Sequence, residues 1–330
     1  MSLSGTLTAT GETRPRASAK PVGDRVLHAL TFAAAVLVLI VLGGVFISLI
    51  QGSWLALSTF GPHFLVSETW NPASDPPVFG AAAPIYGTLL TSVIALLIAV
   101  PIGLGISIFL TELCPAWLAR PIAIAIELLA GIPSIIYGIW GLFVLAPILQ
   151  RSFQPAVIWL FHNKYWDVPG LDKLFAGPPY GIGVFTAALI LAIMILPFIS
   201  SVTRDVFETV PPVLKEAAFG LGCTTWEVIR RVVIPHTRAG VIGAVMLALG
   251  RALGETMAVT FVIGNAHKIA ASILAPGTTI SATIANEFTE ATGDLYTSSL
   301  IALGLILFIV TFIVLAAARW MLHRMERQGR

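Results

Sequence analysis

Arg251 and Glu255 lie inside an otherwise apolar segment, residues 241–263. Counted at about 1.5 Å per residue from Gly240, Arg251 would lie roughly 16 Å into a hydrocarbon core about 30 Å thick. A charge at that depth costs at least about 2.5–3.5 kcal/mol on insertion scales, so we expect it to face protein or water rather than lipid. Glu255 follows four residues later, on the same face of a helix, where it can pair with the guanidinium.

An arginine that is partly neutralised but still offers N–H donors suits the transient binding of an anion. A wholly unpaired arginine would hold the anion too tightly to release it. We therefore expect Arg251 to be the electropositive step of an anion path, with Glu255 beside it. The alternative is a structural ion pair inside the helix bundle, and the sequence leaves it open.

Glu127 is a further acidic residue in an apolar segment. If it points inward, Glu127 or Glu255 could accept the proton-bearing oxygen of a substrate. Hydrogen phosphate carries such a proton and sulfate at neutral pH does not, so acids in the path would favour phosphate. Glu127 could equally reach the membrane interface or make a polar contact there. Ser134 and Tyr137 follow Pro133, which interrupts the segment and frees a backbone carbonyl, and they are candidates to line a pore.

These residues belong to a strongly apolar chain. Of its 330 residues, 57% are hydrophobic and 11% are charged, against roughly 25% charged in soluble domains. The composition indicates an all-α polytopic membrane protein with six transmembrane helices. Their expected ranges, each long enough to cross a bilayer, are 26–50, 84–112, 121–147, 180–202, 241–263 and 296–321.

The remaining segments are tails and loops. We expect a cytoplasmic N-terminal tail at residues 1–25, a transmembrane domain at 26–321 and a cytoplasmic C-terminal tail at 322–330. Within the domain, 115–120 reads as a short turn, and 51–83 and 150–179 read as polar loops. The Thr/Ala-rich segment 264–295 is either re-entrant or on the surface.

Positive charge orients the spans. Fourteen of the 19 Lys and Arg residues lie in the N-terminal tail, at Arg120, in the segment after the fourth span and after Leu315. This bias places these parts and both termini in the cytoplasm. Cys114 and Cys223 fall on the same side, where thiols stay reduced, and neither has a spaced partner, so we expect both to be inert. The six histidines are scattered, and no bound metal is expected.

The longest charged segment between two spans is residues 210–240. A Pro-Pro pair at 211–212 can start a short helix, and Gly222 suits the left-handed residue that ends it. Thr224 and Glu227 form the spacing of a capping box that starts a second helix, which Pro235 is expected to end. A DNA-binding helix-turn-helix is the alternative, but basic residues are not massed on the second helix and membrane segments flank it closely.

This segment resembles the EAA loop of ABC importer permeases, here within residues 203–240. The matching residues are Glu216, Ala217, Ala218, Gly222, Val232, Ile234 and Pro235. Val232 stands where the pattern often has Ile. The resemblance implies a loop that docks on a cytoplasmic ATPase, with Glu216, Ala217, Ala218, Gly222 and Pro235 as coupling residues.

Two further stretches indicate a more specific resemblance within the importer permeases. ELLAGIPSIIYGIWGLF at 127–143 and GRALGETMAVTFVIGN at 250–265 are similar to phosphate-specific importer permeases of the PstC type, over nearly the whole chain. The sister PstA type is similar around the loop but differs after the Arg-x-x-x-Glu step. The resemblance implies a type I ABC importer permease fold in the prokaryotic plasma (inner) membrane. It also implies a PstA-type permease partner, two ATPase subunits and a phosphate-binding protein outside.

The chain has no ATPase site of the P-loop type, since none of its lysines is followed by Ser or Thr. We expect no catalytic residue, no cofactor and no nucleic acid partner, with lipid around the spans. An importer permease for sulfate, molybdate or an amino acid would share the loop but has less reason for the Arg251–Glu255 step. An ATPase-independent transporter or channel would also explain intramembrane charges, although inverted repeats are expected of many such proteins and none is visible.

Overall fold

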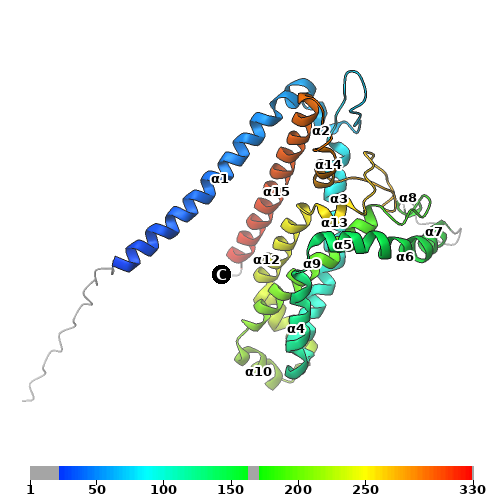
Figure 1. Ribbon diagram of the computed structural model, residues 1–330. Coiled ribbons are helices and arrows are strands. Elements are labelled where there is room, and N and C mark those ends of the chain that lie inside the picture. The colour runs from blue at the N-terminus through cyan, green and yellow to red at the C-terminus, as the bar shows by residue number, and fades with distance from the viewer. Residues whose placement is uncertain (1–21, 163–170, 329–330) are drawn as a thin grey trace, which may run out of the picture. The chain divides into compact units, whose positions relative to one another are not determined.

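The computed structural model describes residues 22–162 and 171–328, which are mainly α-helical (Figure 1). Residues 1–48 and 49–330 form two compact units, called unit 1 and unit 2, and each is described by itself. The expected tails and the 150–179 loop fall partly outside the described residues. The helices before residue 163 are α1 (Val22–Phe60), α2 (His63–Val66), α3 (Ala82–Ile108), α4 (Ala116–Ala130), α5 (Ser134–Trp140), α6 (Ala146–Ile148) and α7 (Gln154–His162). The helices after residue 170 are α8 (Leu171–Leu174), α9 (Val184–Glu208), α10 (Pro212–Gly220), α11 (Thr225–Val228), α12 (Ile234–Leu253), α13 (Met257–Thr260), α14 (Ile280–Glu287) and α15 (Asp294–Gln328).

Six helical segments in the described residues are long and apolar enough to cross a membrane, as predicted. They are Gly23–Phe60, Ala82–Leu113, Ser134–Phe161, Val184–Glu208, Thr225–Leu253 and Asp294–Arg324. Large apolar side chains are exposed along them, for example Leu97 and Phe143. Such exposure fits a lipid solvent, in which helices satisfy their own backbone groups.

The core of unit 2 forms around α9, which packs against α3, α12 and α4. One buried cluster joins Ala95 and Ala99 of α3 to Ile195 of α9 and to Ala248 and Ala252 of α12. Small residues at these contacts let the helix backbones approach closely. The α3–α9–α12 core is therefore the closely packed part of unit 2.

The first helix is longer than predicted. The described part of unit 1 is residues 22–48 of α1. The helix then continues to Phe60, so the polar loop expected from residue 51 begins later. Residues 51–60 contain no proline to stop the helix. Beyond α2, Asn71 and Val78 form an isolated antiparallel bridge, a short hairpin in the predicted loop.

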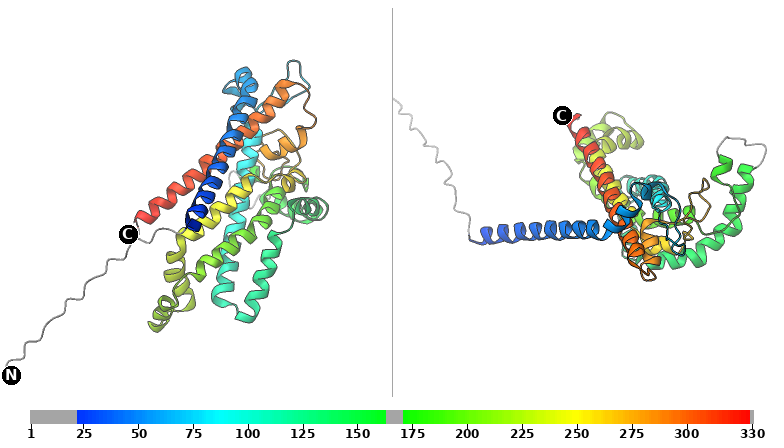
Figure 2. Two further views of the ribbon diagram at one scale, coloured as in Figure 1. Left: turned by 60° about the vertical axis from the view of Figure 1, so that its left-hand side comes forward. Right: turned by 90° about the horizontal axis from the view of Figure 1, so that it is seen from above.

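The third span is broken, and its predicted range of 121–147 is wrong. The expected turn at 115–120 is helical from residue 116 on: Pro115 is extended, and α4 begins directly after it. The helix ends at Ala130, and Pro133 is again extended, with φ −56° and ψ 137°. Proline restricts the residue before it as well, so the interruption falls at 131–133. Figures 1 and 2 show the chain changing direction between α4 and α5, and the spanning segment is Ser134–Phe161.

Pro235 does not end a helix, contrary to the prediction. It lies in the first turn of α12, which continues from α11 through a π-helical turn, η4 (Ile229–Val233). The amide of Ile234 donates to the carbonyl of Ile229, five residues back. Two similar turns, η2 (Gly141–Leu145) and η3 (Leu149–Phe153), come two residues before Pro147 and Pro155. A wider turn accommodates the proline ring and its missing N–H, so these helices continue.

The fifth span also ends earlier than predicted. The helix α12 ends at Leu253 with Gly254 as its cap, and α13 begins at Met257. The predicted helix over 241–263 is therefore two helices separated by a break at 254–256. That break changes the geometry of the charged residues beside it.

The segment after α13 packs into unit 2 and is not a surface loop throughout. Thr278 and Thr279 are buried, and the Thr279 side chain caps α14 by accepting from the amide of Ala282. The amide of Ile280 donates to Thr88 Oγ1 of α3 at 2.9 Å. Gly87 has no room for a Cβ because the carbonyl of Thr278 contacts it. The segment is thus fixed against the start of α3.

Candidate functional site

The hairpin of α10 and α11 has the local structure that its sequence predicts. Gly222 has a φ of +84°, the left-handed region that favours glycine. Thr224 and Glu227 form a capping box: the Thr224 amide donates to Glu227 Oε2 at 2.9 Å, and the Glu227 amide donates to Thr224 Oγ1 at 3.4 Å. These two signals set the angle between the helices. Figure 1 shows α10 and α14 at opposite ends of unit 2.

The hairpin exposes an apolar surface. None of the residues of α10 is buried by the part of the chain that the structure describes. Leu221 is 86% exposed and Val213 is 71% exposed. Glu216 and Ala217 are exposed, and Ala218 is half-buried. An apolar surface of this kind beside charged residues is typical of a protein–protein contact.

Arg251 lies in the last turn of α12 and is exposed, with its guanidinium carbon 4.7 Å from the centre of the Phe198 ring. Glu255 lies beyond the end of the helix, and its buried carboxylate accepts from the Ala258 amide at 3.3 Å. No ion pair joins Arg251 to Glu255 in residues 22–162 and 171–328, so the expected pairing is not present. The four-residue spacing places two side chains together only while the helix continues.

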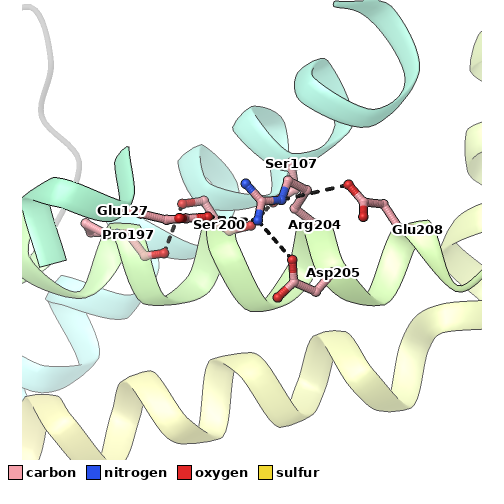
Figure 3. A network of polar contacts seen from close by, with 7 residues as sticks. All are labelled: Ser107, Glu127, Pro197, Ser200, Arg204, Asp205 and Glu208. Atoms are coloured by element: carbon pink, nitrogen blue, oxygen red, sulfur yellow. Dashed lines mark hydrogen bonds and ion pairs between the residues drawn. The ribbon is translucent and has the colours of Figure 1, made fainter. Parts of the chain in front are cut away.

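Glu127 is joined to a residue that the sequence prediction used only as a positive charge (Figure 3). Arg204, near the end of α9, contacts Glu127 of α4 at 2.8 Å, Asp205 at 3.0 Å and Glu208 at 3.9 Å. The Arg204 side chain is 19% exposed, whereas the Glu127 side chain is 47% exposed. This network, called the Arg204 cluster, holds α4 to α9. Within the neighbouring sequence, only Asp205 and Glu208, one and four positions after Arg204, indicate this network.

A cavity of about 720 Å³ lies beside the Arg204 cluster. Residues of α4, α9 and α10 line it, together with the π-helical turn η1 (Phe109–Leu113) that follows α3. Its charged lining residues are Arg120, Glu127, Arg204, Glu208 and Lys215. Both signs of charge are present, so the cavity is polar without being an evident anion site.

Tyr137 and Ser134 lie just after the break in the third span. Tyr137 is buried, and its hydroxyl donates to the Leu129 carbonyl at 2.9 Å, across the break. Ser134 is half-buried at the start of α5. Tyr137 also packs with Ala258 and Val259 of α13, so α5 and α13, each the continuation of a broken span, lie together. Discontinuous helices with paired halves often surround transport sites, and the sequence prediction missed the second break.

A second polar cluster ties the 51–81 region to the segment around α14. Glu287 accepts from Trp70 Nε1 at 2.6 Å and from the Tyr296 hydroxyl at 2.7 Å, and it lies 2.8 Å from His267 Nε2. Burial raises the pKa of Glu287, but the hydrogen bonds from His267, Tyr296 and Trp70 outweigh it and hold the pKa below its usual value. The His267 ring stacks on Trp70 with centroids 5.1 Å apart.

Residues 99–327 match the family described as binding-protein-dependent transport system inner membrane component. The chain belongs to this family. This inner membrane component is 71% identical over 303 residues to a phosphate transport system permease protein PstC of Mesorhizobium japonicum, covering 92% of this chain and 91% of the relative. It is 56% identical over 293 residues to the protein of the same name from Haemophilus influenzae, covering 89% and 91%. These matches confirm the resemblance to the PstC type.

Solved structures of low sequence identity show the fold of this inner membrane component. A chain of a bacterial ABC transporter involved in the import of the acidic polysaccharide alginate is 17% identical, with a TM-score of 0.60, covering 91% of this chain and 96% of that one. A chain of the MetNI methionine ABC transporter in an inward-facing conformation is 16% identical, with a TM-score of 0.54, covering 73% and 94%. The predicted type I ABC importer permease fold is confirmed, and the chain is a multi-pass inner membrane protein.

Proposed function

We propose that this chain is the permease subunit of an ATP-driven importer of inorganic phosphate. The observation that carries the proposal is the 71% identity, over 92% of the chain, to a relative named as a phosphate transport permease. The family description supports a binding protein that delivers the substrate from outside. The other partners would be a PstA-type permease and two copies of an ATPase subunit.

In the proposed mechanism, the hairpin docks on the ATPase. Its exposed apolar side chains would enter a groove on that partner, with Glu216, Ala217 and Ala218 at the contact and Gly222 setting the turn. Pro235, in the first turn of α12, would keep its coupling role as part of a continuous helix. ATP binding would close the ATPase pair and switch the bundle from inward-facing to outward-facing, and hydrolysis would reset it. The chain itself performs no covalent chemistry.

Arg251 is the proposed anion contact. Its guanidinium has an aromatic ring beside it, and none of the ion pairs among the described residues includes it. Its N–H donors could therefore bind a phosphate in a bidentate manner. The ring offsets part of the guanidinium charge but, unlike a carboxylate, occupies none of the N–H donors, so these donors remain available to the anion. Glu255 is the nearest acid along the chain and would accept the phosphate proton. Ser134 and Tyr137 would line the path at the other break, and Glu127 would act through its pair with Arg204.

The test is uptake of radiolabelled phosphate and, separately, sulfate by cells that lack the gene and carry either the natural chain or Arg251→Gln. Membrane levels are checked by blotting. We expect only the natural chain to restore phosphate uptake, with equal insertion of both proteins. Restored sulfate uptake would replace phosphate with another substrate. Normal phosphate uptake by Arg251→Gln would remove Arg251 from the path.

Uptake that persists without the ATPase partner would favour an ATPase-independent transporter. Co-purification of the natural chain with an ATPase subunit is the matching biochemical check. The importer proposal requires both the association and the dependence on ATP.

A further inference from the structure

The two helices of the hairpin are attached to the bundle in different ways. The second, α11, continues through η4 into α12 as one helical segment, Thr225–Leu253. The first, α10, follows α9 through the non-helical residues 209–211, and Pro211 is extended with φ −57° and ψ 129°. Val210 in this linker is buried against Phe207 and Val233, whereas α10 itself buries none of its side chains within the described structure.

An ion pair joins α10 itself to the α3 segment. Lys215 Nζ of α10 lies 2.5 Å from Glu112 Oε1 in η1, at the end of the α3 segment. The Glu112 side chain is 8% exposed and the Lys215 side chain is 21% exposed. A carboxylate buried to this extent strongly favours its paired state, because without a partner it would be an uncompensated charge. Movement of α10 therefore pulls on Glu112.

Glu112 is joined to the closely packed core of unit 2. The α3 segment on which it lies packs against α9 and α12 through the α3–α9–α12 core, where Ala248 and Ala252 of α12 contribute. Ala252 directly follows Arg251. Near the other end of α3, Thr88 holds the amide of Ile280 at the start of α14. A displacement of α3 would thus reach both the proposed anion contact and the far end of unit 2.

We propose that Lys215 is a positioning residue for transport, whose ion pair with Glu112 passes the displacement of α10 to α3. The inference rests on the proposed function, because it takes the hairpin as the place where an ATPase acts. Lys215 lies directly before the EAA motif and faces the rest of the permease, whereas Glu216 is exposed. Lys215 thereby links the exposed docking surface to the helix bundle.

The test measures phosphate imported per ATP hydrolysed, with the assembled importer in proteoliposomes. For Lys215→Ala we expect this ratio to fall about tenfold or more while ATP hydrolysis continues, because the buried carboxylate loses its partner. Lys215→Arg should keep the ratio, and Glu112→Lys combined with Lys215→Glu should restore most of it. The matched control is Arg231→Ala in η4, directly after the hairpin, because the pair of Arg231 with Glu227 is long, at 3.9 Å, and exposed; this variant should leave the ratio unchanged.

A second measurement covers the case in which Lys215→Ala does not assemble. Cysteines replace Lys215 and Glu112 in a chain whose Cys114 and Cys223 are serine, and a short bifunctional thiol reagent joins them. Import that stays coupled after cross-linking supports a connection that moves as one piece. Loss of import with continued ATP hydrolysis would overturn it, since the two residues would then have to separate.

Phosphate import by the natural complex shows whether a negative result counts against the role of Lys215 or against the proposed function. If that complex imports phosphate and Lys215→Ala has the same ratio, the inference is wrong and the proposed function stands. If the natural complex imports no phosphate, the proposed function fails, and the inference fails with it.

Discussion

Gly222 offers a quantitative test of how the hairpin is held. At its φ of +84°, a residue with a Cβ costs roughly 1–2 kcal/mol. Among the described residues nothing lies within 4 Å of a Cβ added there, so the cost of Gly222→Ala is conformational rather than steric. Because α10 buries none of its described side chains, the strain should open the hairpin locally and leave the bundle intact. We expect amides of α10 to exchange hydrogen about 5–30 times faster.

The assay is hydrogen exchange of the purified complex followed by mass spectrometry, with peptides from α10 and from α9 compared. Gly220→Ala is the matched control: it lies in α10, also with open space around it, and should slow exchange because alanine favours a helix by roughly 0.5–1 kcal/mol. Unchanged exchange in α10 of Gly222→Ala would refute the reasoning. Equally faster exchange in α9 would also refute it, because the hairpin would not then be an independent unit.

Three other outcomes follow from the geometry. Gly222→Asp should insert normally but lose coupling of ATP hydrolysis to uptake, which transport and ATPase assays would show; normal uptake would count against docking by the hairpin. Glu255→Gln should lower the phosphate-to-sulfate uptake ratio, and an unchanged ratio would exclude Glu255 as the acceptor of the phosphate proton. Glu287 has a lowered folded-state pKa, so it stabilises the fold above its unfolded pKa of about 4.3, and this contribution is lost as the pH falls through the folded value. Melting curves from pH 7 to pH 3 should therefore show a steeper loss for the natural chain than for Glu287→Gln, and parallel curves would contradict it.

Local sequence signals predicted local structure well. The apolar runs predicted the number of spans, because length and composition alone decide whether a helix can cross a bilayer. The hairpin followed from Gly222 and the Thr224 capping box, whose partners are three residues apart or fewer. Proline was a poorer guide. Pro133 interrupts a helix whereas Pro235 does not, since a π-helical turn before Pro235 accommodates it.

The charged contacts were less predictable because their partners are distant in sequence. Glu127 and Arg204 are 77 residues apart, and Glu112 and Lys215 are 103 apart. The spacing of neighbouring turns in one helix predicted an ion pair between Arg251 and Glu255, four residues later. This prediction was wrong because the helix ends between the two residues. Contacts between helices depend on how whole helices pack, and that packing depends on many residues of several helices together.

The continuous segment from α11 to α12 has a mechanical consequence. From Thr225 to Arg251 it is about 40 Å long at 1.5 Å per residue. If this helical segment tilts about its hairpin end, each degree of tilt would move the end that carries Arg251 by about 0.7 Å. Two degrees would exceed the difference between a made and a broken hydrogen bond. An ATPase that only rocks the hairpin slightly would therefore suffice to change which atoms the guanidinium can reach.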